Sequence, residues 1–412
     1  MERPHHSKLI RQPVYDVNER PFMVIWETTH ACDLACRHCR AEAQPEHDPL
    51  ALTTAEARQL LHQVAEFGRP RPIFIFTGGD PFKRSDLFDL VRYASEIGLP
   101  AAVSPSGTPL LTGENLRRLK EAGARAISLS IDGSTAERHD DFRRVPGSFG
   151  WTANGWRAAR AMGLKVQINT TVTRFNLHDL PGIVRLVQEI GAMTWSLFFL
   201  VPTGRGRQED EVSPAEYEAV MHFLFDVSKY ISAKPVEGHH YKRVVLQRAI
   251  LEEKGLPAED YFCLHPVYYE LRRGLEAVVA AAGLQPRAAG TLHRTPMHIN
   301  AGNGFVFVSR RGEVFPSGFL PLSGGNVRER SLVDIYRDAP LFRDLRDSGK
   351  YAGRCGLCEF VGVCGGSRSR AYAVTGDVLA EEPYCTYEPR SFPFQAELAE
   401  RLAAGAQDDN EQ

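Results

Sequence analysis

Apolar and polar positions follow two different spacings over residues 22–202. Short runs of apolar residues alternate with longer segments in which apolar residues recur with the period of a helix. The apolar runs cover residues 22–26, 73–76, 101–103, 126–131, 165–172 and 194–201. The amphipathic segments between them cover residues 54–67, 86–97, 114–122, 151–162 and 177–190. This alternation predicts an α/β fold of six parallel strands with right-handed helical crossovers, too few units for a closed eight-stranded barrel.

The pattern changes after residue 207. Three further helices are predicted at residues 215–230, 241–253 and 266–281, and no catalytic motif accompanies them. A hairpin is predicted at residues 304–315, and an amphipathic helix at residues 332–345. We therefore expect an N-terminal extension (1–20), an α/β domain (21–207), a helical connecting region (208–299), a small cysteine-rich domain (300–390) and a C-terminal tail helix (391–412).

Composition excludes several classes of protein. Of the 412 residues 43% are hydrophobic and 24% charged, and the net charge of −2 provides no basic surface for nucleic acid or an anionic membrane. No apolar run is long enough to span a bilayer, and the first residues lack the apolar core of a signal peptide. The eight cysteines fall in groups of three, one and four. This grouping indicates a cytoplasmic protein whose thiols bind metal rather than form disulfides.

The first cysteine group, Cys32, Cys36 and Cys39, directly follows the first predicted strand with the spacing C-x3-C-x2-C. Thiolates are soft metal ligands, and this spacing lets the chain curl around an ion or a cluster. Three thiolates are an incomplete set for tetrahedral zinc or for a four-iron cluster. Either His30 or His38 completes a zinc site, or one position is left open for chemistry.

The second cysteine group is a complete set of four. Cys355, Cys358 and Cys364 have the spacing C-x2-C-x5-C, and Cys385 follows. Four thiolates suit an iron–sulfur cluster, and a structural zinc ion is the alternative. The remaining Cys263 is most simply an inert buried thiol, and a catalytic role as a substrate contact or hydrogen-atom donor is the alternative.

Polar residues gather at the carboxyl ends of the predicted strands, where parallel sheets bind their ligands. They are Gly78, Gly79, Asp80 and Pro81 after the second strand, Ser104 after the third, Ser130 and Asp132 at the fourth, Asn169 in the fifth and Arg205 after the sixth. Paired glycines permit close backbone approach, a carboxylate can receive an ammonium group, and an arginine can pair with a carboxylate. Taken singly, each is more often part of an ordinary turn or a satisfied strand end.

The first cysteine group resembles the signature of the radical S-adenosylmethionine (SAM) superfamily, C-x3-C-x-aromatic-C, with His38 in the aromatic position. The Gly-Gly-Asp-Pro run looks like the GGEP motif of that family, with Asp80 in place of glutamate. The resemblance implies a partial (β/α)6 barrel whose three cysteines bind a 4Fe–4S cluster. It further implies that SAM occupies the fourth iron and the polar strand ends, and that its cleavage yields a 5′-deoxyadenosyl radical that abstracts hydrogen from a substrate.

Residues 354–385 resemble the SPASM/Twitch extension of radical SAM enzymes, and especially those that modify haem precursors. This resemblance implies one auxiliary 4Fe–4S cluster, bound by Cys355, Cys358, Cys364 and Cys385. A full SPASM domain has further cysteines, whose places are held here by residues 300–302, by Ser317 and by Ser367.

The function expected from these resemblances is that of a radical SAM oxidoreductase or maturase. Its substrate would be a tetrapyrrole side chain or a ribosomally made peptide, and its reductant a low-potential electron donor such as flavodoxin or ferredoxin. The short segment before the first strand leaves no room for a peptide-recognition domain, which favours the tetrapyrrole. A non-catalytic zinc-binding scaffold is the alternative from another class of protein.

Overall fold

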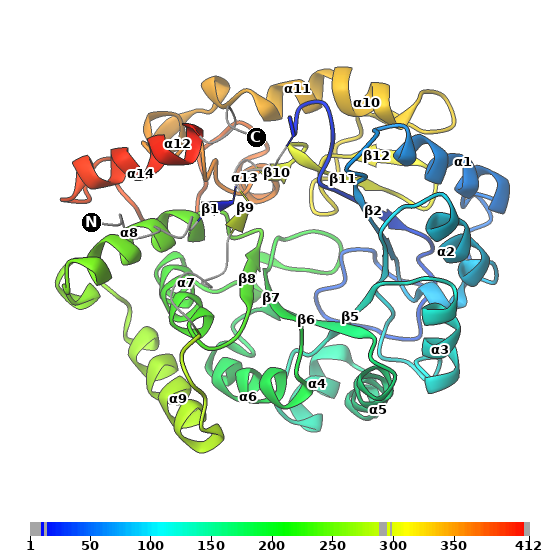
Figure 1. Cartoon of the computed structure of the whole chain (residues 1–412), viewed down its shortest axis with the longest axis horizontal. Coiled ribbons are helices and arrows are strands. Elements are labelled where there is room, and N and C mark those ends of the chain that lie inside the picture. The colour runs from blue at the N-terminus through cyan, green and yellow to red at the C-terminus, as the bar shows by residue number, and fades with distance from the viewer. Residues whose placement is uncertain (1–9, 12–14, 288–294, 297–298, 408–412) are drawn as a thin grey trace, which may run out of the picture.

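The computed structural model describes residues 10–11, 15–287, 295–296 and 299–407. All six predicted strands are present and pair in parallel, in chain order. They are β2 (Met23–Glu27), β3 (Ile73–Thr77), β4 (Ala101–Val103), β5 (Ala126–Ser130), β6 (Lys165–Val172) and β7 (Thr194–Phe199). Figure 1 shows them curving around a common interior with helices on the outer side, which confirms the predicted partial barrel.

The helices between these strands lie where the amphipathic spacing predicts them. They are α1 (Thr54–Ala65), α2 (Leu87–Glu96), α3 (Gly113–Glu121), α5 (Ser148–Ala161) and α6 (Leu180–Ile190). A capping box starts α1, because the N–H of Glu56 donates to Thr53 Oγ1 (3.3 Å) and the N–H of Thr53 donates to Glu56 Oε2 (2.8 Å). One helix between these strands was not predicted: α4 (Ala136–Arg143) is polar over most of its surface and therefore lacks the usual apolar stripe.

The sheet continues past β7 into residues 208–299, which were expected to form a helical connecting region. A strand that the sequence analysis did not predict, β8 (Ala233–Val236), lies there and pairs in parallel with β7. Pro235 conceals this strand in the sequence, and the structure tolerates the proline because β8 is the last strand on its side of the sheet. The three helices expected in this region are present as α7 (Pro214–Ser228), α8 (Tyr241–Glu253) and α9 (Pro266–Ala282).

The sheet also continues past β2, into the cysteine-rich region. The predicted hairpin consists of β11 (Gly304–Val308) and the antiparallel β12 (Glu313–Phe315), followed by β13 (Gly325–Asn326). Strand β11 pairs in parallel with β2, with Phe307 opposite Ile25, and the short β10 (Asn300–Ala301) pairs with β11. One sheet therefore runs from the hairpin to β8 through the barrel.

The helix predicted at residues 332–345 is divided into α10 (Leu332–Asp338) and α11 (Pro340–Arg346), because Pro340 cannot continue the first helix. The tail region contains α14 (Gln395–Gln407), and residues 408–412 lie outside the described chain. In the N-terminal extension, residues 1–9 and 12–14 also lie outside the described part of the chain. The other elements are β1 (Ile10–Arg11), which pairs with β9 (Thr295–Pro296), α12 (Gly353–Leu357), α13 (Arg368–Thr375), and the 3-10 turns η1 (Pro81–Lys83), η2 (Leu177–Asp179), η3 (Gln208–Asp210), η4 (Ala258–Asp260) and η5 (Ser348–Lys350).

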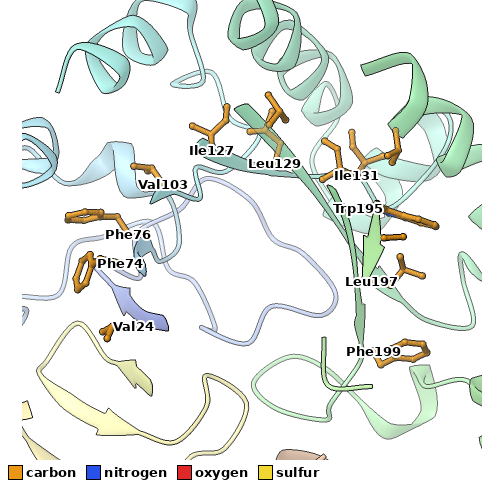
Figure 2. Packing of buried hydrophobic residues seen from close by; sticks show 14 of the residues in the cluster. Val24, Phe74, Phe76, Val103, Ile127, Leu129, Ile131, Trp195, Leu197 and Phe199 are labelled. Carbon is orange, nitrogen blue, oxygen red and sulfur yellow. The ribbon is translucent and has the colours of Figure 1, made fainter. Parts of the chain in front are cut away.

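The largest hydrophobic core lies between the outer face of the sheet and the helices. Phe74, Leu129, Trp195 and Leu197 are fully buried there, and Figure 2 shows them on the side of the strands that faces the helices. Since successive strand residues point to opposite faces, the residues between them face the interior of the barrel. No helix in the described part of the chain is long and apolar enough to cross a membrane.

Candidate active site

The first cysteine group lies in the loop that leaves β2. Cys32 and Cys36 are buried and pack in one small cluster, against which the half-buried Cys39 lies. The loop closes on itself, because the N–H of Cys32 donates to the carbonyl oxygen of Gln44 (2.8 Å) and the N–H of Gln44 donates to that of His30 (3.1 Å). The three thiols are thus held close together by local chain geometry.

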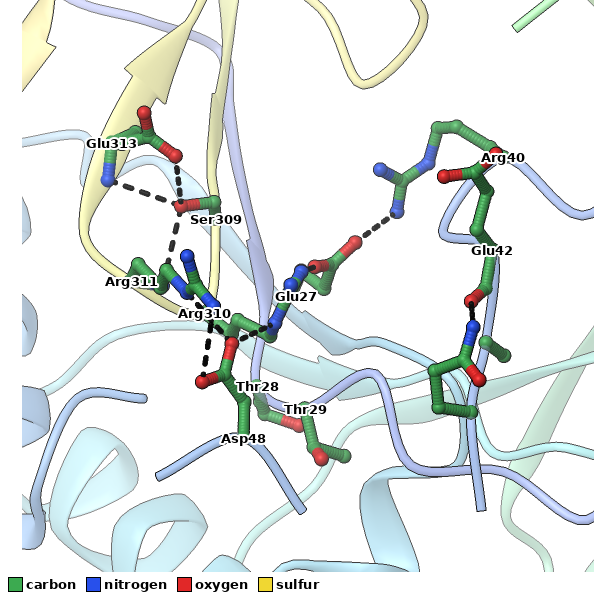
Figure 3. A network of polar contacts seen from close by, with 12 residues as sticks. Glu27, Thr28, Thr29, Arg40, Glu42, Asp48, Ser309, Arg310, Arg311 and Glu313 are labelled. Carbon is green, nitrogen blue, oxygen red and sulfur yellow. Dashed lines mark hydrogen bonds and ion pairs between the residues drawn. The ribbon is translucent and has the colours of Figure 1, made fainter. Parts of the chain in front are cut away.

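The loop is tied to the hairpin by the network of carboxylates and guanidinium groups in Figure 3. Glu27 pairs with Arg40 (2.9 Å) and with Arg310 (2.9 Å), and Asp48 pairs with Arg310 (2.6 Å) and Arg311 (2.8 Å). Burial opposes ionisation of Asp48, but hydrogen bonds from Arg311 and Arg310 hold the pKa of its carboxyl group well below the usual range. Both ends of the cysteine loop are therefore anchored to the C-terminal region.

The paired glycines after β3 allow the turn after this strand to lie close to the backbone of the cysteine loop. The N–H of Gly79 donates to the carbonyl oxygen of Thr29 (2.8 Å), and the N–H of Asp80 donates to that of Ala31 (2.7 Å). A Cβ atom on Gly79 would lie 2.5 Å from the Ala31 oxygen, and one on Gly78, where φ is +151°, would lie 2.3 Å from the Thr29 oxygen. Only glycine lets this turn lie against the cysteine loop.

Asp80 is fully buried, and its carboxylate accepts hydrogen bonds from Thr108 Oγ1 (2.6 Å) and from the N–H of Phe82 (3.2 Å) at the start of η1, whose first residue is Pro81. Its side chain therefore joins the turns after β3 and β4. The hydroxyl group of Ser104 is hydrogen-bonded to that of Ser128, with 2.5 Å between the two Oγ atoms. Ser106, which the sequence analysis did not select, reaches the site instead, because its Oγ lies 3.6 Å from Cys32 Sγ.

Asp132 is the centre of a buried cluster beside Cys36. Its carboxylate accepts a hydrogen bond from the N–H of Thr171 (2.7 Å) and pairs with Arg143 of α4. Arg143 Nη1 in turn lies 3.5 Å from Cys36 Sγ, and its Nε is buried without a partner among the described residues. Burial opposes the charge of this guanidinium, but Asp132 and Cys36 raise its pKa above the usual value. Sequence analysis missed Arg143 because α4 was not recognised.

His38 and Arg205 also have buried nitrogen atoms without a hydrogen-bond partner among the described residues. The ring of His38 packs on Phe142, with 4.7 Å between centroids, and its buried Nδ1 has no partner among the described residues. The N–H of Arg205 donates to the carbonyl oxygen of Cys39 (3.0 Å), while its buried Nε and Nη2 have no partner in the described chain. Such orphaned donors beside three thiols fit a site for an anionic, polar ligand such as the carboxylate of SAM.

Ser130 and Asn169 are direct neighbours across β5 and β6, and both face the barrel interior. Of the other expected SAM contacts, Gly79, Asp80 and Arg205 hydrogen-bond to the backbone of the cysteine loop. Cys263 was expected to be buried, and this expectation is wrong: the thiol is exposed between η4 and α9 and does not line the cavity of the second group.

The second cysteine group lines a single cavity. Its walls include all four sulfurs together with His240, Arg243 and Tyr387. Cys355 Sγ accepts a hydrogen bond from the N–H of Glu382 (3.2 Å), and Arg368 Nη2 lies 3.7 Å from it. Burial raises the pKa of Cys358 to about 12 and that of Cys364 to about 12, so a bound metal must displace the thiol protons. No three His, Cys, Asp or Glu side chains in the described ranges lie as close together as ligands of a single ion do, and each cysteine of a four-iron cluster binds a different iron.

Ser317 and Ser367, which hold two of the positions expected to be cysteines in a full SPASM domain, lie against one buried carboxylate, that of Glu237, together with Ser369. The carboxylate oxygens accept hydrogen bonds from the hydroxyl groups of Ser317 (3.0 Å), Ser369 (3.1 Å) and Ser367. Nearby, Asn300 Nδ2 donates to the carbonyl oxygen of Gly366 (2.8 Å). A polar network thus fills the place of the missing thiols.

Comparisons with known proteins agree with this geometry. The radical SAM superfamily profile matches residues 26–187. The chain is 42% identical over 376 residues to a protein named AdoMet-dependent heme synthase from Oleidesulfovibrio alaskensis, covering 90% of this chain and 88% of that protein. It is 31% identical to Fe-coproporphyrin III synthase from Methanosarcina barkeri, covering 88% and 87% of the two chains. Identity to PqqA peptide cyclase from Rhodopseudomonas palustris is 28%, covering 90% and 88%.

The fold is shared with solved structures. Streptococcus suis SuiB bound to S-adenosylmethionine superposes with a TM-score of 0.62 at 14% identity, covering 90% of this chain and 78% of that one. The relatives replace the zinc-scaffold alternative with an enzyme that uses SAM and an iron–sulfur cluster. The chain belongs to the radical SAM superfamily and is related to the AdoMet-dependent heme synthases.

Proposed function

We propose that this enzyme converts propionate side chains of an iron tetrapyrrole, as its relatives named for haem synthesis suggest. The observation that carries the proposal is the 42% identity over 90% of the chain to a protein named AdoMet-dependent heme synthase. The presence of four, rather than more, cysteines in the C-terminal region agrees with it, because this set leaves no open iron to bind a substrate group.

In this proposal Cys32, Cys36 and Cys39 hold the first cluster. When bound, that cluster and SAM supply a 5′-deoxyadenosyl radical that takes a hydrogen atom from carbon. Arg143 and Arg205 carry unused, buried nitrogens beside the thiols, and we assign them to the SAM carboxylate. The remaining SAM contacts are those expected from the strand ends, namely His38, Gly78, Gly79, Asp80, Pro81, Ser130, Asp132 and Asn169, with Ser106 in place of Ser104, whose hydroxyl group is bonded to that of Ser128.

The second cysteine group holds the auxiliary cluster in this proposal, with Cys355, Cys358, Cys364 and Cys385 as ligands. A propionate that loses one hydrogen atom, then CO2 and one further electron, becomes a vinyl group. That electron needs an acceptor, and a fully ligated cluster in a buried site is suited to receive it. A low-potential donor such as flavodoxin or ferredoxin would reduce the first cluster, and the free thiols suit a reducing cytoplasm.

The test is an anaerobic assay of the reconstituted enzyme with reductant, SAM and iron-coproporphyrin III. We expect 5′-deoxyadenosine, CO2 and a vinyl-bearing porphyrin, identified by mass spectrometry. A matched reaction with a porphyrin that lacks propionates should yield no CO2. If iron-coproporphyrin III is unchanged while a peptide encoded by a neighbouring gene is modified, the proposal is wrong and the peptide alternative is correct.

A further inference from the structure

Lys234 lies on the interior face of the barrel, in a row of polar residues. It is opposite Ser196 of β7, which is opposite Asn169 of β6, which is opposite Ser130 of β5. The outward direction is marked by Leu129 and Trp195, which face the helices in Figure 2. Because side chains alternate along a strand, the row that contains Lys234 faces the interior.

The ammonium group of Lys234 has no counterion among the residues that the structure describes. Its Nζ makes no hydrogen bond or ion pair with any described residue, and burial alone lowers the pKa of this side chain. Three other cations of the barrel and its rim are ion-paired: Arg40 with Glu27 (2.9 Å), Arg143 with Asp132 and Arg370 with Glu211 (3.3 Å). A partly buried charge without a partner is costly, so an unpaired cation at such a place indicates an anionic ligand.

The neighbours of Lys234 have the character of a binding site for an amphipathic anion. Ser196 is fully buried, and its Oγ has no partner in the described part of the chain. One step further along the strands, Phe198 is opposite Val236, and its ring lies 6.4 Å from that of Phe319. A cation and a free hydroxyl group thus stand beside an apolar, aromatic surface, which suits a flat aromatic ligand that carries carboxylates.

Lys234 also lies between the two proposed cofactor sites. Ser130 and Asn169, expected near SAM, are in its own row, and three strand steps place its Cα about 14 Å from that of Ser130. In the other direction β8 leads within a few residues to His240, which lines the cavity of the second cysteine group. A ligand that spans this distance would have one end near SAM and the other at Lys234.

We propose that Lys234, together with Ser196, binds a carboxylate of the tetrapyrrole other than the one that reacts, and so determines which side chain faces SAM. This inference rests on the proposed function and assigns a substrate-binding role to a strand that the motifs did not include. Neither residue takes part in the chemistry itself.

The experiment compares Lys234→Met with Lys234→Arg in the full-length, cluster-loaded enzyme, by anaerobic titration with iron-coproporphyrin III followed by visible absorbance. We expect Lys234→Met to weaken binding about 10- to 100-fold, the range for a lost charge-assisted hydrogen bond, and Lys234→Arg to retain most of the affinity. Lys165→Met is the matched control, because that lysine is exposed at the start of β6, and its affinity should equal that of the wild type.

A second arm uses the porphyrin with its propionates converted to methyl esters. The wild type should bind the ester more weakly than the acid, and Lys234→Met should lose most of this discrimination, as expected when the two changes remove the same interaction. Equal binding of the acid by wild type and Lys234→Met, or undiminished discrimination in the variant, would overturn the assignment of Lys234. Failure of the wild type to bind iron-coproporphyrin III would instead contradict the proposed function, and this inference with it.

Discussion

The two cysteine groups differ in how many thiols each can offer to an iron–sulfur cluster. The first has three thiols on one loop, and beside it Arg205 has two buried nitrogens without a partner in the described chain. The second has four thiols around one cavity, where Arg243 is ion-paired with Glu218 (2.6 Å) and Arg368 donates to the carbonyl oxygen of Ala380 (2.6 Å), although the Nε of each is buried without a partner among the described residues. The number of thiols is what separates the two sites: an incomplete set marks a site open to a ligand, whereas a complete set marks a closed one.

The largest expected effect comes from the open site. Changing Cys36 to Ala removes one of only three thiolates, so the first cluster cannot be held and release of 5′-deoxyadenosine should fall to background. High-performance liquid chromatography of anaerobic reactions measures this, and iron and sulfide analysis should show that the second cluster remains. Wild-type levels of 5′-deoxyadenosine from this variant would show that the first group is not the SAM-binding site.

Changing Cys358 to Ala should separate SAM cleavage from product formation. The first cluster keeps its ligands, so 5′-deoxyadenosine is still released, but the electron left by the substrate has no acceptor and the vinyl product is lost. Cys263→Ala is the matched control, since that thiol is exposed and lies outside the cavity of the second group. Unchanged product from Cys358→Ala would remove any chemical role for the second cluster, and loss of product from Cys263→Ala would revive the hydrogen-donor alternative.

A smaller effect is expected at the rim of the open site. Arg205→Met should weaken SAM binding about 10- to 100-fold, because the variant loses charge-assisted hydrogen bonds to the SAM carboxylate, and should leave the iron content unchanged. Equilibrium dialysis with labelled SAM measures the affinity. Arg207→Met is the control, because Arg207 is exposed and pairs only with surface Glu209 (3.2 Å) among the described residues. Equal affinities of the two variants would exclude Arg205 from the SAM site.

The smallest effect concerns the network that replaces the missing thiols. Ser317→Ala removes one of three hydroxyl donors to Glu237, and the free energy of unfolding should fall by about 1 kcal/mol. Chemical denaturation measures this loss, and the iron content should not change. A loss of iron from Ser317→Ala would mean that this position contributes to a cluster.

Local patterns predicted most of the fold. The strands from β2 to β7 and their helices follow from apolar spacing and from helix ends at Gly68, Gly98 and Gly123, all of which have positive φ. Strand β8 was not predicted because Pro235 breaks the usual strand pattern, although a strand at the edge of a sheet tolerates a proline. Helix α4 was not predicted because its polar surface lacks an apolar stripe, and Arg143 was therefore not recognised as a site residue.

The two cysteine groups could be recognised from their spacing alone, but the residues that surround the two sites could not. Glu237 and Ser317 are 80 residues apart, and Lys234 becomes notable only when the register of β8 places it in the barrel interior, where no described residue is its counterion. Such long-range partners depend on the fold, and nothing in the neighbouring sequence marks them. The role of the paired glycines also needed the structure, since Gly79 accommodates the backbone of the cysteine loop.

The most direct test of the contrast between open and closed sites is electron paramagnetic resonance of reduced enzyme with and without SAM. It is measured on Cys358→Ala, which keeps only the first cluster, and on Cys36→Ala, which keeps only the second. We predict that SAM changes the spectrum of Cys358→Ala and leaves that of Cys36→Ala unchanged, because only the first cluster has an iron without a thiolate. A SAM-dependent spectrum in Cys36→Ala, or none in Cys358→Ala, would contradict the account.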